Sequence, residues 1–378
     1  MVEAQTKQNK RSGVLICGAY GQGNAGDEAV LRAIVGQMRA IDPNMPITVM
    51  TRTPEKTAAD HGVHTLHSFD MIGFIRAASS AELFLNGGGS LIQDVTSRRS
   101  LWYYLFTLRT ARALGCKVIM YGCGIGPVNH SGDRKMTRRI LNKTVDIITL
   151  REDASLAELH ALGVEAPEIV LSADPALTLE PAAAGEVDAE FLRRGMDPKG
   201  KYICFALRDW DGFEEKTVCF RQAAEYAYEK YALTPLFVSI NHVSDGEASA
   251  RATSDIGCPY HIIDDTMPSD LTIGVLSRMA AVVSMRLHGL IFSAGHGIPL
   301  IAVSYDPKVT AFMGYIGQNL CVELHQLTAD RLCGMIDEAV AEAVDKQYLA
   351  AQVERLRAIE ERNSESVRRL LGRQEGNR

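Results

Sequence analysis

The sequence lacks several features that would assign the protein to a specialised class. Of its eight cysteines, no two have the C-x-x-C spacing of a zinc or redox motif. No run of about 18 apolar residues is present, so we expect no transmembrane helix. The polar start of the chain, MVEAQTKQNKRSG, has no apolar core of a signal peptide. We therefore expect a cytoplasmic protein whose cysteines are reduced.

A strong charge excess is also missing. The formal net charge is −6, with 46% hydrophobic and 23% charged residues, which is typical of a globular protein. Nothing in this balance suggests a nucleic-acid partner. The 378 residues exceed what one hydrophobic core usually organises, so we expect two domains.

Apolar runs of strand length alternate with helical runs from Val14 to Ala173, and the alternation restarts at Lys201. This pattern predicts two α/β domains, each with a parallel, doubly wound sheet. The Pro- and Ala-rich stretch 175–187 breaks the alternation and is expected to be the linker. We predict an N-terminal Rossmann-like domain over residues 1–178, a C-terminal Rossmann-like domain over 179–345, and a C-terminal helix over 346–378.

Residues 281–308 have the pattern of a βαβ unit, with Arg286, His288 and Lys308 after its two strands. Ligands of open α/β sheets bind at the carboxyl ends of the strands. One imidazole between two cations suits an anionic ligand that needs a proton. An isolated histidine near an apolar helix start is more often structural, but the neighbouring cations favour the functional interpretation.

Glycine-rich loops follow three strands of the first half, at residues 18–28, 86–94 and 121–127. Glycines let the backbone approach a ligand and point N–H groups at it. Asn24 and Asp27 are equally suited to cap the following helix, and the loop at 86–94 also contains ordinary turn residues. Because Arg151, Asp174 and Arg208 end strands too, we expect these groups to face one interdomain cleft.

Two other patterns are open to a second interpretation. His61, His64 and His67 have a spacing of three, but they do not form one regular helix and no carboxylate or cysteine cluster accompanies them, so we expect no metal site. The aromatic run Trp102–Phe106 suggests a core or an interface. Its flanking arginines also suit a surface that touches lipid headgroups.

At these motifs the chain resembles the polysaccharide pyruvyl transferase family, and most closely the CsaB-type bacterial enzymes of secondary cell wall polymer synthesis. The resemblance runs from about Gly13 to about residue 340. It rests on Gly18-x-Tyr20-Gly21-x-Gly23-Asn24-x-Gly26-Asp27-Glu28, on Asn86-Gly87-Gly88-Gly89-Ser90-x-x-Gln93-Asp94, and on Arg286-Leu287-His288-Gly289 with Tyr305-Asp306-Pro307-Lys308. It implies two Rossmann-like domains facing a cleft, as in GT-B glycosyltransferases, with the C-terminal helix crossing back onto the first domain.

The resemblance also implies a reaction, in which pyruvate moves from phosphoenolpyruvate to a sugar as a ketal and phosphate is released. In CsaB-type enzymes the acceptor is the N-acetylmannosamine of a lipid-diphosphate-linked disaccharide, bridged at O4 and O6, in a pathway of S-layer anchoring. Such an acceptor implies peripheral contact with the inner face of the cell membrane. We expect no cofactor and no metal, because cationic side chains supply the charge.

Site residues follow from the same motifs. The resemblance implies His288 as the general acid, with Arg151 and Lys308 beside it in catalysis. The residues expected to bind the substrates, Arg208 because it ends a strand at the cleft, are Arg286, Arg208, Tyr20, Asn24, Asp27, Asn86, Gly87, Gly88, Gly89 and Asp94. Two alternatives stay open: a nucleotide-sugar-dependent GT-B glycosyltransferase, and a non-catalytic carbohydrate-binding protein of the same fold.

Overall fold

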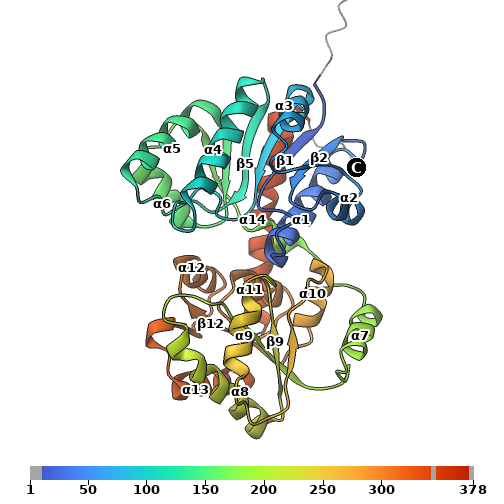
Figure 1. The fold of residues 1–378 in the computed structure, drawn as a ribbon, viewed down its shortest axis with the longest axis vertical. Helices are drawn as coiled ribbons and strands as arrows, with labels where there is room; N and C mark the ends of the chain where they lie inside the picture. Colours follow the sequence, from blue (N-terminus) through green and yellow to red (C-terminus); the bar gives the residue numbers. More distant parts are fainter. Residues whose placement is uncertain (1–10, 342–345, 374–378) are drawn as a thin grey trace, which may run out of the picture.

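Two parallel α/β domains form the molecule, one above the other in Figure 1. The computed structural model describes residues 11–341 and 346–373, so the predicted domain ends at 1–10, 342–345 and 374–378 lie outside the described residues. No helix within the described ranges combines the length and the apolar character needed to cross a membrane.

The first domain has a seven-stranded sheet in the order β3-β2-β1-β4-β5-β6-β7. Every strand pair in it is parallel. Its strands are β1 (Val14–Cys17), β2 (Ile47–Thr51), β3 (His64–His67), β4 (Leu83–Gly87), β5 (Lys117–Cys123), β6 (Ile147–Leu150) and β7 (Glu168–Leu171). Its helices are α1 (Ala25–Ile41), α2 (Pro54–His61), α3 (Met71–Ser80), α4 (Arg98–Ala113), α5 (Ser131–Thr144) and α6 (Asp153–Leu162).

The second domain has a six-stranded parallel sheet in the order β10-β9-β8-β11-β12-β13. Its strands are β8 (Tyr202–Ala206), β9 (Thr234–Val238), β10 (His261–Ile263), β11 (Ala281–Ser284), β12 (Leu300–Ser304) and β13 (Cys321–Glu323). Its helices are α7 (Ala184–Arg193), α8 (Thr217–Tyr231), α9 (Asp245–Thr253), α10 (Ser269–Leu276), α11 (Leu287–Ala294), α12 (Pro307–Tyr315) and α13 (Ala329–Val340).

Both sheets reverse their strand order beside the first strand of the domain, at β1/β4 and at β8/β11. A crevice opens at such a switch point, outside the carboxyl ends of the strands. The fold predicted from the sequence, two doubly wound parallel domains, is confirmed.

The last helix, α14 (Lys346–Leu371), belongs in space to the first domain (Figure 1). Its Asn363 side chain donates from Nδ2 to the carbonyl of Ala173 at 3.1 Å. Its Glu360 carboxylate accepts a 2.8 Å hydrogen bond from Gln37 of α1. The chain therefore returns across the junction between the domains and ties the two together.

The apolar cores explain how the layers are held. Residues of α3, α4, α5 and α6 pack on one face of the first sheet, with Phe74, Leu105 and Leu141 fully buried. On the other face, one continuous core joins α1 and α14 to α10 and α11 of the second domain. Burial of this shared apolar surface fixes the two domains against each other.

The stretch 175–187, predicted as a linker, contains structure. Residues Pro175–Thr178 form a 3-10 helix, and α7 starts at Ala184. The Glu186 side chain accepts a 3.2 Å hydrogen bond from the backbone N–H of Ala183, which satisfies a donor at the start of α7. Phe191 then anchors α7 in the core. The high Ala content that suggested a linker is also compatible with a helix.

Candidate active site

A cavity of about 640 Å³ lies between the domains. The loops after β1, β4, β5 and β6 line it from the first domain, and the loops after β8, β11 and β12 line it from the second. Both sheets thus direct their carboxyl ends at one space. Eight of the predicted site residues line it: Asn24, Asp27, Gly89, Arg151, Arg208, Arg286, His288 and Lys308.

His288 lies where the two domains touch. It is the second residue of α11, and its ring packs against the first turn of α1, since a Cβ on Gly26 would come within 2.1 Å of His288 Nδ1. Only a glycine fits there without a shift. His288 Nε2 lies 3.6 Å from Asp174 Oδ2 and is buried, with no hydrogen-bond partner among the described residues. Such an atom is suited to a ligand contact.

Asp174 joins His288 to Arg151. Its carboxylate accepts a 2.7 Å hydrogen bond from Arg151 Nη1, and only 4% of the residue is exposed. Burial raises the pKa of Asp174, but the neighbouring His288 and Arg151 outweigh it and hold the pKa well below its usual range. Asp174 therefore stays ionised beside His288 and Arg151.

Arg151 is buried between two carboxylates. Besides Asp174, its Nε donates to Glu152 Oε2 at 3.0 Å. Its Nη2 lies 3.4 Å from Ser90 Oγ, in the glycine-rich loop after β4. The guanidinium is thereby held rigidly at the wall of the cavity, with its charge largely offset by the two carboxylates.

Asp27 faces the same cavity from the first turn of α1. Asn24, the N-cap of this helix, donates from Nδ2 to Asp27 Oδ2 at 2.7 Å. Burial raises the pKa of Asp27, while the charges of His288 and Arg151 lower it in part. A carboxylate with a raised pKa at the wall of a cavity is a candidate proton acceptor.

The three cations of the second domain differ in their surroundings. Arg286 pairs with the buried carboxylate of Asp245, with Nε 2.9 Å from Oδ2. Lys308 lies 2.9 Å from Asp306, the N-cap of its own helix. Arg208 has no carboxylate within ion-pair distance among the residues that the structure describes. Arg208 is thus the cation whose charge is least compensated.

Arg208 is nevertheless held in place. Its guanidinium lies over the rings of Trp210 and Tyr305, at 4.5 and 4.8 Å from the ring centroids, and it donates to the Tyr305 hydroxyl. Planar stacking of this kind orients an arginine without neutralising it. The arrangement is that of an anion-binding arginine.

Five predicted substrate-binding residues do not line the cavity. Tyr20 is buried and donates its hydroxyl to the carbonyl of Gly87 at 2.7 Å. Asn86 is buried behind the loop, and at Gly88, with φ 69°, a Cβ would meet Val30 at 2.2 Å. The geometry gives the set a supporting role, in which they shape the loops that carry the lining: Tyr20, Asn86, Gly87, Gly88 and Asp94.

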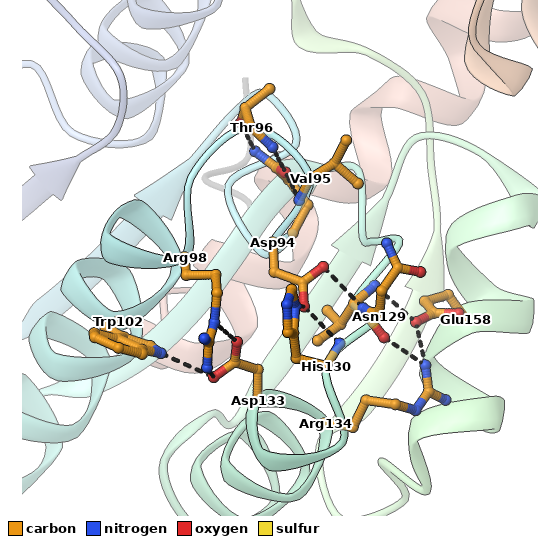
Figure 2. A network of polar contacts seen from close by, with 12 residues as sticks. Asp94, Val95, Thr96, Arg98, Trp102, Asn129, His130, Asp133, Arg134 and Glu158 are labelled. Atoms are coloured by element: carbon orange, nitrogen blue, oxygen red, sulfur yellow. Dashed lines mark hydrogen bonds and ion pairs between the residues drawn. The ribbon is translucent and has the colours of Figure 1, made fainter.

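Asp94 is part of the polar network drawn in Figure 2. Its carboxylate accepts hydrogen bonds from the backbone N–H groups of Asn129 and His130, both at 2.8 Å, and another from the His130 ring. These donors lower the pKa of Asp94 against the effect of its burial. Asp94 therefore fixes the start of α5 and has no free oxygen directed at the cavity lining.

The same network holds a group of potential metal ligands. Ligand atoms of Asp94, His130 and Asp133 lie within 4.8 Å of one another. Asp133 already accepts from Arg98 Nε at 2.7 Å and from Trp102 Nε1 at 2.9 Å (Figure 2). The arginine charge beside Asp133 disfavours a cation, so we assign no metal to the group. The expectation that no metal is needed stays a prediction.

A second cavity, of about 800 Å³, lies on the other side of the contact between Asn24 and Asn241. Its acidic and basic side chains are mixed, and Arg32 and Asp270 in its lining pair across the domains at 2.8 Å. Neither His288 nor Arg151 reaches it. We therefore place the candidate active site in the cavity around His288.

Several residues of this site were not assigned a role from the sequence. Asp174 was placed at the sheet edge only by its position before Pro175, and Glu152, Ser90, Trp210 and Tyr305 were not singled out. Tyr305 belongs to a quoted motif, which was the available signal. The pairing of Asp174 with His288, 114 positions apart in number, depends on how the domains meet.

Comparison with known proteins agrees with this geometry. The model of the family "Polysaccharide pyruvyl transferase" matches residues 24–307. The amylovoran biosynthesis protein AmsJ of Erwinia amylovora is 19% identical over 362 residues, which cover 80% of this chain and 86% of that protein.

Solved structures share the fold. HepE of Anabaena in complex with UDP-glucose has a TM-score of 0.63 at 10% identity, covering 94% of this chain and 99% of HepE. The UDP-GlcNAc 2-epimerase of Neisseria meningitidis bound to UDP-GlcNAc has a TM-score of 0.64 at 10% identity, covering 95% of this chain and 100% of the epimerase. At such identities the likeness shows the fold alone. The family match, which spans residues 24–307 and hence most of the chain, shows that the chain belongs to the polysaccharide pyruvyl transferase family.

Proposed function

We propose that the protein transfers pyruvate from phosphoenolpyruvate to two hydroxyls of a hexosamine, forming a ketal and releasing phosphate. The observation that carries the proposal is the buried, unpartnered Nε2 of His288 in a cavity that also contains Arg151, Arg208 and Lys308. Phosphoenolpyruvate carries a carboxylate and a phosphate, and it reacts only after protonation. The three cations can bind the two anionic groups, and the imidazole can supply the proton.

The donor binds on the side of the second domain. Arg208, whose charge is least compensated, contacts one anionic group, and Lys308 contacts the other. Arg151 stabilises the charge that develops on the leaving phosphate. Arg286 acts less directly, because its guanidinium is already paired with Asp245. It orients the start of α11 and hence His288.

His288 donates its proton to the methylene carbon of phosphoenolpyruvate, which leaves C2 electrophilic. A first sugar hydroxyl adds to C2 and loses its proton. A second hydroxyl then displaces phosphate, which leaves with the electron pair of the C2–O bond. Asp27, close enough to His288 to feel its charge, accepts the proton of the first hydroxyl, and the proton of the second hydroxyl leaves with the phosphate.

The acceptor that the motifs favour is the N-acetylmannosamine of a lipid-diphosphate-linked disaccharide, ketalised at O4 and O6. The first-domain wall, with Asn24, Asp27 and Gly89, offers the amide, carboxylate and open backbone that sugar hydroxyls require. AmsJ is named as a protein of amylovoran biosynthesis, which is consistent with a polysaccharide precursor as acceptor.

The test is to incubate the protein with phosphoenolpyruvate and a synthetic lipid-linked ManNAc-GlcNAc, without added metal. Phosphate release with a pyruvyl ketal on the product supports the proposal. His288→Gln should abolish release, while His296→Gln, a matched change outside the cavity lining, should leave it intact. The absence of release with every amino-sugar acceptor contradicts the proposal.

A glycosyltransferase remains the second candidate, because HepE was solved with UDP-glucose and shares the architecture. The larger interdomain cavity has room for a sugar nucleotide. A ligand that binds the folded state raises the melting temperature. Stabilisation by UDP-sugars but not by phosphoenolpyruvate favours the glycosyltransferase.

A further inference from the structure

An unusual surface covers one flank of the first domain, where α3, α4 and α5 pack side by side on the sheet (Figure 1). Five large apolar side chains on it are exposed: Phe69, Ile72, Ile75, Trp102 and Phe106. Ile72 is 74% exposed, Trp102 44% and Phe106 48%. Exposed apolar residues scattered singly are normal, whereas a group on adjacent elements marks an interaction surface.

The exposed apolar and basic side chains of α4 lie in one row along the helix. On α4, Arg99, Trp102, Phe106 and Arg109 follow one another at spacings of three and four, so they form one stripe along the outer side of the helix. Next to it, Phe69 packs edge-on against Tyr103 of α4 with ring centroids 5.8 Å apart, which joins the start of α3 to the same surface.

The surface is basic although the whole chain has a net charge of −6. Helix α4 carries four arginines and no carboxylate. Helix α5 carries five lysines and arginines and a single carboxylate, Asp133, which is buried and bound by Arg98 and Trp102 (Figure 2). The acidic Asp70 next to Phe69 is engaged in capping α3.

Most of these cations are uncompensated. Arg112 pairs with Asp146 and Arg134 with Glu158. The others have no carboxylate within ion-pair distance among residues 11–341 and 346–373: Arg76, Arg99, Arg109, Lys135, Arg138, Arg139 and Lys143. A face of unpaired cations has a positive potential and attracts an anionic partner.

We propose that the outer face of α3, α4 and α5 docks on a bilayer that contains anionic phospholipids. Exposed aromatic and aliphatic side chains enter the headgroup region, and the surrounding arginines and lysines contact lipid phosphates. Aliphatic side chains such as Ile72 and Ile75 offer nothing to a nucleic acid, whereas they gain free energy when they enter lipid. The partly buried hydrogen bond from Trp102 Nε1 to Asp133 fixes the indole at the surface.

The docking face is continuous with the active-site cavity. Val95 and Thr96 line the cavity, and the next residue, Ser97, caps α4. The first turn of α4, with Arg99, therefore lies at the edge of the cavity, and Trp102 follows in the next turn. The inference deepens the proposed function, because a sugar on a lipid diphosphate would be met at the bilayer surface. Vesicle binding does not depend on turnover, so the two proposals fail separately.

Co-sedimentation with vesicles tests the inference. We compare phosphatidylcholine vesicles with vesicles that also contain phosphatidylglycerol, using the full chain and no substrate. Binding to the anionic vesicles that decreases as salt is added, with little binding to neutral ones, is the expected result. The double variant Arg99→Glu/Arg109→Glu should weaken partitioning roughly tenfold or more, and Ile72→Ser/Phe106→Ser should also weaken it.

The matched control reverses two exposed cations of the second domain, Lys199→Glu/Arg331→Glu, which changes the net charge equally. Full binding by this control is expected. If the control loses vesicle binding to the same extent, the net charge of the protein alone drives binding, and the inference is overturned. If the protein binds neither vesicle type, the inference is overturned. It is also overturned if the wild type is a dimer that dissociates in the Ile72→Ser/Phe106→Ser variant. Tighter binding to a single-stranded oligonucleotide than to anionic vesicles likewise overturns it.

Discussion

Replacing Asp174 by Asn tests how the site holds its proton donor. The side chain keeps its shape, and Asn Oδ1 can still accept the 3.0 Å hydrogen bond from the backbone N–H of Ala176 that Asp174 accepts. The amide group then faces His288 and Arg151, where the carboxylate had been. The substitution therefore removes one negative charge and the hydrogen-bond acceptor of Arg151 Nη1.

The magnitude follows from the geometry. A protonated His288 whose Nε2 lies 3.6 Å from the Asp174 carboxylate is attracted by about 4 to 5 kcal/mol at an effective dielectric constant of about 20. Arg151 binds the same oxygen and offsets part of this attraction. If half remains, the imidazolium loses about 2 kcal/mol, which lowers the rate roughly 30-fold.

The assay is phosphate release from phosphoenolpyruvate between pH 6 and pH 8. We expect the loss to be larger at pH 8 than at pH 6, because added protons compensate for a weaker attraction. Unfolding in urea should show a stability loss of about 3 kcal/mol, since a partner of a buried ion pair is gone.

Glu152→Gln is the matched control, because Glu152 also pairs with Arg151 but not with His288. It should reduce stability by a similar amount without the pH-dependent loss of rate. If Asp174→Asn and Glu152→Gln have the same pH–rate profile, or if Asp174→Asn is fully active at pH 8, the role assigned to Asp174 is refuted.

Three further predictions rest on single residues. Arg208→Gln should raise KM for phosphoenolpyruvate at least tenfold with a smaller effect on kcat, and an unchanged KM in steady-state kinetics would exclude Arg208 from the donor site. Asp27→Asn should abolish the rise in rate with pH that a base with a raised pKa produces, so a pH–rate profile like the wild type's would contradict its role. Burial raises the pKa of Glu360 from 4.5 to about 7. Between these pH values Glu360 therefore keeps a proton in the folded state that it loses in the unfolded state. The contribution of Glu360 to stability should therefore fall by roughly 3 kcal/mol as the pH rises through this window and stay constant above it. Glu360→Gln should make the fall in stability smaller by that amount in urea unfolding, and an unchanged pH dependence would refute the reasoning.

The sequence predicted the fold class, because strand-length apolar runs and amphipathic helices alternate with little ambiguity. It also predicted which loops meet, since the carboxyl ends of parallel strands share an edge. His288, Arg151 and Lys308 were brought to one cavity in this way.

The sequence could not predict which groups each side chain of the site contacts. Arg286 was expected to bind the donor, yet its guanidinium is paired with Asp245, which begins α9 41 positions earlier. Arg208 was also predicted to bind a substrate, but the sequence did not show that its neighbours are aromatic and leave its charge available. Such pairings depend on distances between loops that are remote along the chain.

The glycine motif after β4 shows a related limit. Three consecutive glycines indicated close approach to a ligand, but only Gly89 lines the cavity. At Gly87 and Gly88 the close approach is to Tyr20, Ile34 and Val30 of the same domain. A glycine pattern in the sequence indicates that other atoms lie close to the backbone, but it does not show whether those atoms belong to a ligand or to the protein itself.

Pyruvyl transfer in D₂O tests the central claim most directly. The protein, phosphoenolpyruvate and the lipid-linked acceptor are combined in D₂O, and the isolated ketal is returned to H₂O and analysed by mass spectrometry. Protonation of the methylene carbon by an exchanged His288 predicts one deuterium in the ketal methyl group, with no product from His288→Gln. A ketal without carbon-bound deuterium, or transfer of a hexose in place of pyruvate, would contradict the account.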